Sequence, residues 1–255
     1  MHKINVSTIN YLNSTPFNYG LNNSAIIEKI ALQENTPNDC ANLLKEEKVN
    51  IGLAPIAIIP HLKKAFIISD YCIGCYGAVK SVCIYSNVKI QYVKKIYTDN
   101  HSITSVFLAK ILSAFYWQIK PEWINIELNN LKEIKSKHET ILAIGDKTFY
   151  YEKEYLYCYD LGEVWLDFTS LPFVFACWIS NTELDESFIQ EFNTSLLYGL
   201  KRKPESLEHK DIKSLKIDKQ TALNYITNNI SYEFNSDKQK ALKTYFDYLY
   251  KYQHR

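Results

Sequence analysis

Asn13, Ser14 and Thr15 stand directly before Pro16 and follow the apolar segment INVSTI. If a strand ends here and a helix begins, an amide, two hydroxyls and free backbone N–H groups face the space beyond the strand. A helix N-terminus carries roughly half a positive charge, so such a turn favours a carboxylate or another anion. An ordinary turn, in which the same side chains bond only to the backbone, is the alternative.

Three further polar groups are candidates for the same kind of site. They are Ser81 in GAVKSVCIYS, the hydroxyls of Ser102, Thr104 and Ser105 in DNHSITS, and Asp146 in ILAIGD. Ser81 is expected within a strand, whereas the others come at strand ends or helix starts. Two hydroxyl-rich helix starts suit a small dianion. Each group also has a structural explanation, as a helix cap, a turn cap or a hydroxyl bonded to the backbone.

The sequence offers little support for a metal or a cofactor. Cys72 and Cys75 have the spacing of half a zinc site or a redox pair, but no second pair of this kind follows. We therefore expect the six cysteines to be small buried hydrophobes. The six histidines show no HExxH pattern, and there is no GxGxxG, GxxxxGK[ST] or GxSxG sequence. We expect no metal and no cofactor.

Composition restricts the class of partner. The chain has 255 residues, 29 basic against 28 acidic side chains and a formal net charge of +1, so no polyanion such as nucleic acid is implied. No run of 18 apolar residues is free of charge, and no secretion signal opens the sequence. We expect a soluble cytoplasmic protein without a membrane partner, for which a homodimer stays open.

Short strand-like and helical segments alternate through the first 180 residues. Strands are expected at 3–9, 25–32, 49–56, 65–73, 78–86, 94–99, 123–128, 140–146 and 171–180, and helices at 35–48, 56–64, 100–117 and from 184 onward. Thr36 is the expected N-cap of the first of these helices, with Pro37 in its first turn. This order predicts an α/β protein with largely parallel sheets, whose binding site lies beyond the strand C-termini. Two lobes are expected, the second inserted through crossing strands.

Six segments follow one another along the chain: INYLNSTPF, DCANLLKEEKVNIGLAPIAIIP, CIGCYGAVKSVCIYS, DNHSITSVFLAKIL, LAIGDKTF and YDLGEVWLDFTSLPFVFACW. In order and spacing they resemble the MqnA family, the chorismate dehydratases of the futalosine route to menaquinone. The resemblance implies a type II periplasmic-binding-protein fold with a ligand cleft between two lobes. One lobe would hold residues 1–86 and 175–255 and the other residues 87–174, with hinges near Ser86 and Phe173.

The family reaction converts the dicarboxylate chorismate to 3-[(1-carboxyvinyl)oxy]benzoate and water. The resemblance implies that no side chain of the matching motifs serves as the base and that the enolpyruvyl carboxylate of the substrate takes the proton. Asn13 would be the catalytic residue that positions the substrate. The resemblance implies substrate-binding roles for Ser14, Thr15, Ser81, Ser102, Thr104, Ser105 and Asp146. A turn-capping role for Asp146 stays open, and we read Asp160 as a helix cap and Trp165 and Phe173 as packing residues.

The chain departs from the family pattern at Cys75-Tyr76 and at Ser170, which concerns the shape of the cleft more than its chemistry. Three other functions stay open. A solute-binding receptor and the effector domain of a transcription regulator would share the fold, but a secretion signal and a helix-turn-helix segment are not visible. The paralogous 1,4-dihydroxy-6-naphthoate synthase shares the fold and lacks the YLN opening.

Overall fold

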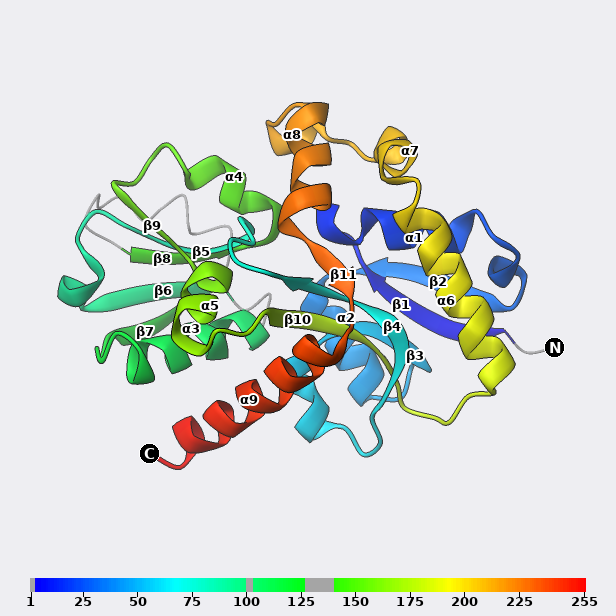
Figure 1. Ribbon diagram of the computed structural model, residues 1–255, viewed down its shortest axis with the longest axis horizontal. Helices are drawn as coiled ribbons and strands as arrows, with labels where there is room; N and C mark the ends of the chain where they lie inside the picture. The colour runs from blue at the N-terminus through cyan, green and yellow to red at the C-terminus, as the bar shows by residue number, and fades with distance from the viewer. Residues whose placement is uncertain (1–2, 100–102, 127–139) are drawn as a thin grey trace. The chain divides into compact units, whose positions relative to one another are not determined.

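The computed structural model describes residues 3–99, 103–126 and 140–255. The chain divides into two compact units (Figure 1). Unit 1 holds residues 1–74 and 174–235, and unit 2 holds residues 75–173 and 236–255. This division differs from the lobes expected from the resemblance, because residues 75–86 and the C-terminal helix fall in unit 2.

Unit 1 contains a six-stranded sheet in the order β11-β4-β10-β3-β1-β2. Its strands are β1 (Ile4–Ile9), β2 (Ile30–Asn35), β3 (Ile51–Pro55), β4 (Phe66–Cys75), β10 (Phe173–Ser180) and β11 (Ser231–Glu233). β1 pairs in parallel with β2 and β3, but β10 runs antiparallel to β3, and β11 runs antiparallel to β4. The expected largely parallel sheet is therefore wrong. The sheet is mixed because β10 and β11 enter it from the second half of the chain.

The helices of unit 1 connect these strands and cover the sheet. They are the 3-10 helices η1 (Leu12–Ser14), η2 (Ala25–Glu28), η3 (Ile56–His61), η7 (Leu207–His209) and η8 (Lys213–Leu215), the π-helix η9 (Tyr225–Asn229), and α1 (Thr15–Asn22), α2 (Pro37–Lys45), α6 (Glu186–Leu200), α7 (Lys203–Ser206) and α8 (Lys219–Asn224). The helix expected at 35–48 is confirmed, and the Thr36 hydroxyl accepts the Asp39 N–H at 3.2 Å.

The first half of the strand expected at 25–32 is wrong, since residues 25–28 form η2 and β2 begins only at Ile30. Ile26 and Ile30 are fully buried, whereas Glu28 and Lys29 between them are exposed. Only Ile26 of η2 is buried and Ile30 already belongs to β2, so burial does not alternate through residues 25–30 as it would in a strand. A short apolar run therefore did not distinguish the two structures.

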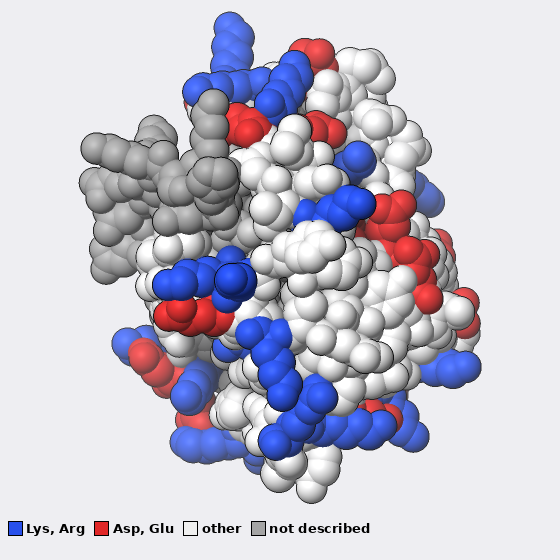
Figure 2. All heavy atoms as spheres, turned by 90° about the vertical axis from the view of Figure 1, so that its left-hand side faces the viewer, with Lys and Arg blue, Asp and Glu red and all other residues white. Residues whose placement is uncertain are grey.

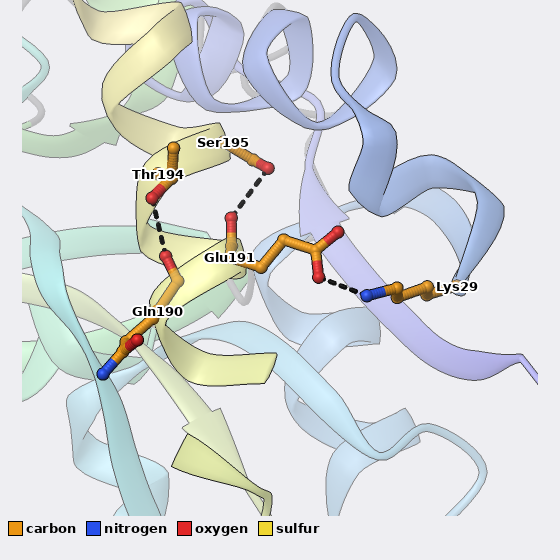
Figure 3. A network of polar contacts seen from close by, with 5 residues as sticks. All are labelled: Lys29, Gln190, Glu191, Thr194 and Ser195. Carbon is orange, nitrogen blue, oxygen red and sulfur yellow. Dashed lines mark hydrogen bonds and ion pairs between the residues drawn. The ribbon is translucent and has the colours of Figure 1, made fainter. Parts of the chain in front are cut away.

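The backbones of α1 and α6 touch, because each helix has a glycine at the contact. A Cβ atom on Gly20 would lie 2.1 Å from the Ser195 carbonyl oxygen, and one on Gly199 would lie 1.8 Å from the Pro16 carbonyl oxygen. Figure 3 shows the polar side chains of α6 next to this contact, with Glu191 forming an ion pair with Lys29. Since α1 begins at Thr15, its packing on α6 fixes the turn that carries Asn13.

Unit 2 contains a five-stranded sheet in the order β7-β6-β8-β5-β9. Its strands are β5 (Val82–Ser86), β6 (Lys95–Asp99), β7 (Glu122–Ile126), β8 (Thr140–Ile144) and β9 (Tyr157–Asp160), and its helices are η4 (Ile90–Tyr92), α3 (Ile103–Phe115), η6 (Gly145–Lys147), α4 (Thr148–Tyr151), α5 (Leu161–Thr169) and α9 (Ser236–Gln253). β6 pairs in parallel with β7 and β8, and β5 runs antiparallel to β8 and β9.

The C-terminal helix α9 belongs to unit 2 because its aromatic side chains pack there. The ring of Tyr248 lies 5.0 Å from that of Phe168 in α5 and 5.3 Å from that of Phe115 in α3. Tyr245 is fully buried against Trp165 and Phe173. The packing role expected for Trp165 and Phe173 is confirmed.

The Asp160 carboxylate joins two segments of unit 2. As the N-cap of α5 it accepts the N–H groups of Gly162 at 2.9 Å and Glu163 at 3.2 Å. It also accepts the N–H groups of Val79 at 3.0 Å and Lys80 at 2.6 Å, just before β5. The cap expected at Asp160 is confirmed, and the same side chain also fixes the approach to Ser81.

Ser81 does not lie within a strand as expected, because β5 begins only at Val82. Lys80 has a φ of 64°, in the left-handed region, which is incompatible with a regular strand. The amides of Val79 and Lys80 bond to Asp160, so they are not available to a sheet ladder. Ser81 therefore occupies the last position of a loop held by one carboxylate.

We expect Gly199→Ala to lower the free energy of unfolding by about 1–3 kcal/mol, because the new methyl group would meet a backbone carbonyl that cannot move without α1. Gln190→Ala, on the exposed side of the same helix, should change it by less than about 0.5 kcal/mol. Urea unfolding followed by circular dichroism measures both. Equal stability of the two variants would contradict the close helix contact.

Asp160→Asn should lower the free energy of unfolding by about 2–4 kcal/mol. The amide keeps one oxygen acceptor, but its NH2 group is a donor and would face backbone N–H groups that need an acceptor. Thr36, which only caps its own helix, offers a comparison, and Thr36→Ala should lower the free energy of unfolding by about 1 kcal/mol. Hydrogen exchange should also rise at the amides of Val79 and Lys80 in the Asp160 variant. Unchanged exchange there would show that the loop does not depend on the carboxylate.

Candidate functional site

The turn after β1 uses its hydroxyl groups internally. The buried Ser14 hydroxyl contacts the carbonyl oxygens of Ile9 and Tyr11, the latter at 2.8 Å, and the Tyr11 N–H lies 3.4 Å from it. The Thr15 hydroxyl donates to the Tyr11 carbonyl oxygen at 3.3 Å. Ser14 and Thr15 therefore hold the turn closed around Tyr11, as in the structural alternative given above. Binding of a ligand by either side chain stays a prediction.

Asn13 differs from its neighbours. Its side-chain oxygen Oδ1 is buried and has no hydrogen-bond partner among the described residues. A buried acceptor left without a donor costs free energy. Other buried side-chain atoms of the described residues, among them Trp178 Nε1 and Asn181 Oδ1, also lack a partner, so Asn13 is distinguished by its place in the turn after β1. The backbone of Asn13 is fixed as well, because the Tyr232 hydroxyl donates to its carbonyl oxygen at 3.0 Å.

Tyr232 comes from β11 and is part of the site that the sequence did not indicate. Burial raises its pKa well above the ordinary value, so its hydroxyl keeps the proton that it donates to Asn13. Its ring packs edge-on against Phe17 in α1, with 5.2 Å between the centroids. The two bonded residues are 219 positions apart, and no local sequence signal could have joined them.

A second asparagine beneath the turn has a structural role. Asn18 accepts the Thr8 hydroxyl at 2.7 Å and donates through Nδ2 to the Ile9 carbonyl oxygen at 3.1 Å. Both ends of its amide are occupied within α1 and β1. Asn13 differs from Asn18 in that its side-chain oxygen has no partner among the described residues.

In unit 2 the candidate residues lie at one end of the strands of the sheet. The Gly145 N–H donates to the Ser81 carbonyl oxygen at 2.8 Å, so Ser81 is directly beside the turn that carries Asp146. Gly145 has a φ of 75°, which its lack of a side chain permits, and its carbonyl oxygen accepts the Thr148 hydroxyl at 2.9 Å. Ser81 and Asp146 are both buried.

The start of α3 lies at the same edge. β6 and β8 run in parallel with Thr98 opposite Leu142, so their C-terminal ends point the same way. α3 follows β6, and its first turn contains the buried residues Thr104 and Ser105 and no acidic side chain. Ser81 is therefore beside the Asp146 turn, and Thr104 and Ser105 open the helix that follows the neighbouring strand β6, while Ser102 lies outside the described residues. A helix start with two hydroxyls suits a carboxylate.

Figure 2 shows one face of the molecule, on which basic and acidic side chains are interspersed among broad uncharged areas. No three His, Cys, Asp or Glu side chains of the described segments lie together as a metal site would require. Within those segments, no helix has the length and apolar character needed to cross a membrane.

The cysteines follow the expectation with one exception. Cys72 and Cys75 of β4 are buried, as are Cys40, Cys83 and Cys177. Burial raises the pKa of the Cys40 thiol to about 12, which makes it a poor nucleophile. Cys158 is exposed, so its expected burial is wrong. It lies in β9, a short strand that the sequence pattern did not predict.

The fold is that of periplasmic binding proteins. A protein from Archaeoglobus fulgidus has a TM-score of 0.80 at 14% identity, covering 100% of this chain and 99% of that one. The Candida albicans CA3427 gene product, described as having the generic periplasmic binding protein fold, has a TM-score of 0.66 at 12% identity over 100% and 95%. The periplasmic aliphatic sulphonate binding protein SsuA from Escherichia coli has a TM-score of 0.65 at 10% identity, covering 99% of this chain and 93% of that one. The expected α/β class and fold are thus confirmed.

A protein family described as menaquinone biosynthesis matches residues 4–251. The match spans both units and includes the turn after β1, the loop before β5, the start of α3 and the Asp146 turn. Since it covers nearly the whole sequence, the chain belongs to the menaquinone biosynthesis family.

Proposed function

We propose that this protein is a chorismate dehydratase, which converts chorismate to 3-[(1-carboxyvinyl)oxy]benzoate and water. The observation that carries the proposal is the buried, unpartnered Oδ1 of Asn13 in the YLNSTP turn. An anion-binding turn alone would need only donors, whereas Asn13 offers an acceptor. Membership of the menaquinone biosynthesis family supports an enzymatic role.

The elimination begins with loss of the proton on ring carbon 3. The negative charge that develops there spreads through the adjacent double bond to the ring carboxylate. The first turn of α3, with Thr104 and Ser105, supplies N–H groups and hydroxyls that would stabilise this charge. Ser81 and Asp146, at the same sheet edge, would complete the contacts to the ring. Departure of the ring hydroxyl makes the ring aromatic and drives the step forward.

The substrate itself supplies the base in this mechanism. Its enolpyruvyl carboxylate takes the proton from carbon 3 and returns it to the departing hydroxyl, so that water leaves and the charges balance. The protein then has to hold the reacting groups in position rather than supply a base. Asn13 would accept a hydrogen bond from the ring hydroxyl through Oδ1, and Tyr232 would hold the Asn13 backbone in place.

A non-catalytic dicarboxylate-binding protein is a second candidate. It is favoured by the similarity of fold to SsuA, whose printed description is that of a binding protein. Such a protein would bind chorismate without converting it. The paralogous 1,4-dihydroxy-6-naphthoate synthase would instead act on the cyclic futalosine derivative.

We expect purified protein incubated with chorismate to produce the aromatic proton NMR signals of the carboxyvinyloxy-benzoate. Asn13→Ala should lower the rate by about 100-fold or more, because it removes the positioning acceptor. Tyr232→Phe keeps the amide and loses one hydrogen bond to its backbone, and should lower the rate by about tenfold. Asn23→Ala, an exposed asparagine at the end of α1, should leave the rate unchanged.

The outcomes distinguish the candidates. Saturable chorismate binding without aromatic product would reject the dehydratase and favour the binding protein. Turnover of the cyclic futalosine derivative with no reaction of chorismate would favour the synthase. Normal activity of Asn13→Ala would retain the dehydratase but reject the role given to the turn after β1.

A further inference from the structure

A cavity of about 400 Å³ lies in unit 1, where the end of α6 and the start of α7 meet α8 and η9. Its lining comes from residues 200–204 and 220–228 and includes Leu200, Lys203, Pro204, Leu223, Asn224 and Asn228. Pockets of roughly 300–1,000 Å³ with apolar walls and a few polar groups are typical of small-molecule sites. The cavity is therefore large enough for a small organic ligand, and its polar groups indicate which kind.

Lys203 brings a positive charge that the described residues do not neutralise. Its side chain is half-buried, and burial lowers its pKa. The ammonium lies 5.1 Å from the ring centroid of Tyr232, which attracts a cation but carries no negative charge. No carboxylate of the described residues forms an ion pair with it. An anion that enters the cavity would stabilise this partly desolvated cation.

The helical segment that lines the cavity supplies an ordered pair of amides. Asn224 is the last residue of α8, and Asn228 follows one turn later in the π-helix η9. The Asn228 side chain donates through Nδ2 to Oδ1 of Asn224 at 2.6 Å. This bond leaves the Asn224 NH2 group as a donor with no other partner among the described residues. The lining thus combines a cation, an amide donor and the apolar side chains of Leu200, Pro204 and Leu223.

We propose that this cavity binds a small aromatic carboxylate and that Lys203 pairs with the carboxylate group. The Asn224 NH2 group would donate to the same anion, and the ring would lie against the apolar side chains of the lining. One half-buried cation matches one negative charge. A dianion would bring a second charge into the cavity, where the other lysine of the lining, Lys201, is exposed to water. The inference does not depend on the reaction proposed above.

The test uses benzoate as the probe and measures binding at Lys203 itself. Reductive methylation with 13C-formaldehyde keeps the charge of each lysine and gives it an NMR signal, and the signal missing from Lys203→Met belongs to Lys203. We expect benzoate to shift this signal until it saturates. Benzamide, which has the same ring without the charge, and inorganic phosphate should each need about tenfold higher concentration or more for the same shift. The signal of Lys213, an exposed residue of η8, should not move.

A further pair of variants tests the amide. Asn224→Ala should raise the benzoate concentration at half-maximal shift about threefold or more, because one donor to the anion is lost. Asn23→Ala, at the end of α1, should leave it unchanged. Lys203→Arg also removes the Lys203 signal and keeps the charge, so the assignment does not require Lys203→Met to fold.

The outcomes decide the proposal without any turnover of chorismate. No shift of the Lys203 signal by benzoate, or an equal shift by benzamide, would overturn it. A shift by inorganic phosphate at a lower concentration than by benzoate would overturn the aromatic carboxylate as the ligand. An unchanged half-maximal concentration in Asn224→Ala would overturn the contact given to the amide.

Discussion

The carboxylate of Asp160 is the interaction on which unit 2 depends. It bonds four backbone N–H groups from two segments about eighty positions apart, at the start of α5 and just before β5. Its Oδ1 accepts the N–H groups of Val79, Gly162 and Glu163, and its Oδ2 accepts that of Lys80. Lys80 stays in a left-handed conformation because its N–H has this partner, and Ser81 reaches the Gly145 turn as a result. The position of Ser81 beside the Asp146 turn thus follows from a helix cap.

In unit 1, close packing of two helices fixes the turn that carries Asn13. Gly20 and Gly199 let the backbones of α1 and α6 touch, and no larger residue fits at either position. This contact sets where α1 begins, and α1 begins at the residue after Ser14. Tyr232 then fixes the Asn13 backbone from the last strand of the sheet. Helix packing and a single long-range hydrogen bond thus fix the Asn13 turn, whereas in unit 2 the Asp160 carboxylate fixes the loop that carries Ser81.

Local chemistry explains which features the sequence predicted. Thr36 and Asp160 cap helices because each cap bonds an amide two or three residues away, which a sequence pattern can show. The short segment at 25–28 was misread because a few apolar residues fit a helical turn as well as a strand. The contacts of Asn13 with Tyr232 and of Asp160 with Val79 depend on the tertiary fold, so only the structure gives them. The exposure of Cys158 likewise depends on β9 being an edge strand.

The proposed dehydratase would need more from this fold than a binding protein does. Strand ends and helix starts supply fixed donors, and fixed donors are sufficient to hold an anion. A reaction in which a hydroxyl departs needs, in addition, a group that keeps this hydroxyl aligned while the proton moves. Asn18 shows what an asparagine does when it serves only the fold, because both ends of its amide are bonded. The Asn13 backbone accepts the Tyr232 hydroxyl, and its side-chain oxygen has no partner among the described residues. In a buried position such an acceptor destabilises the free protein, and binding of a hydroxyl to it would recover that free energy in the complex.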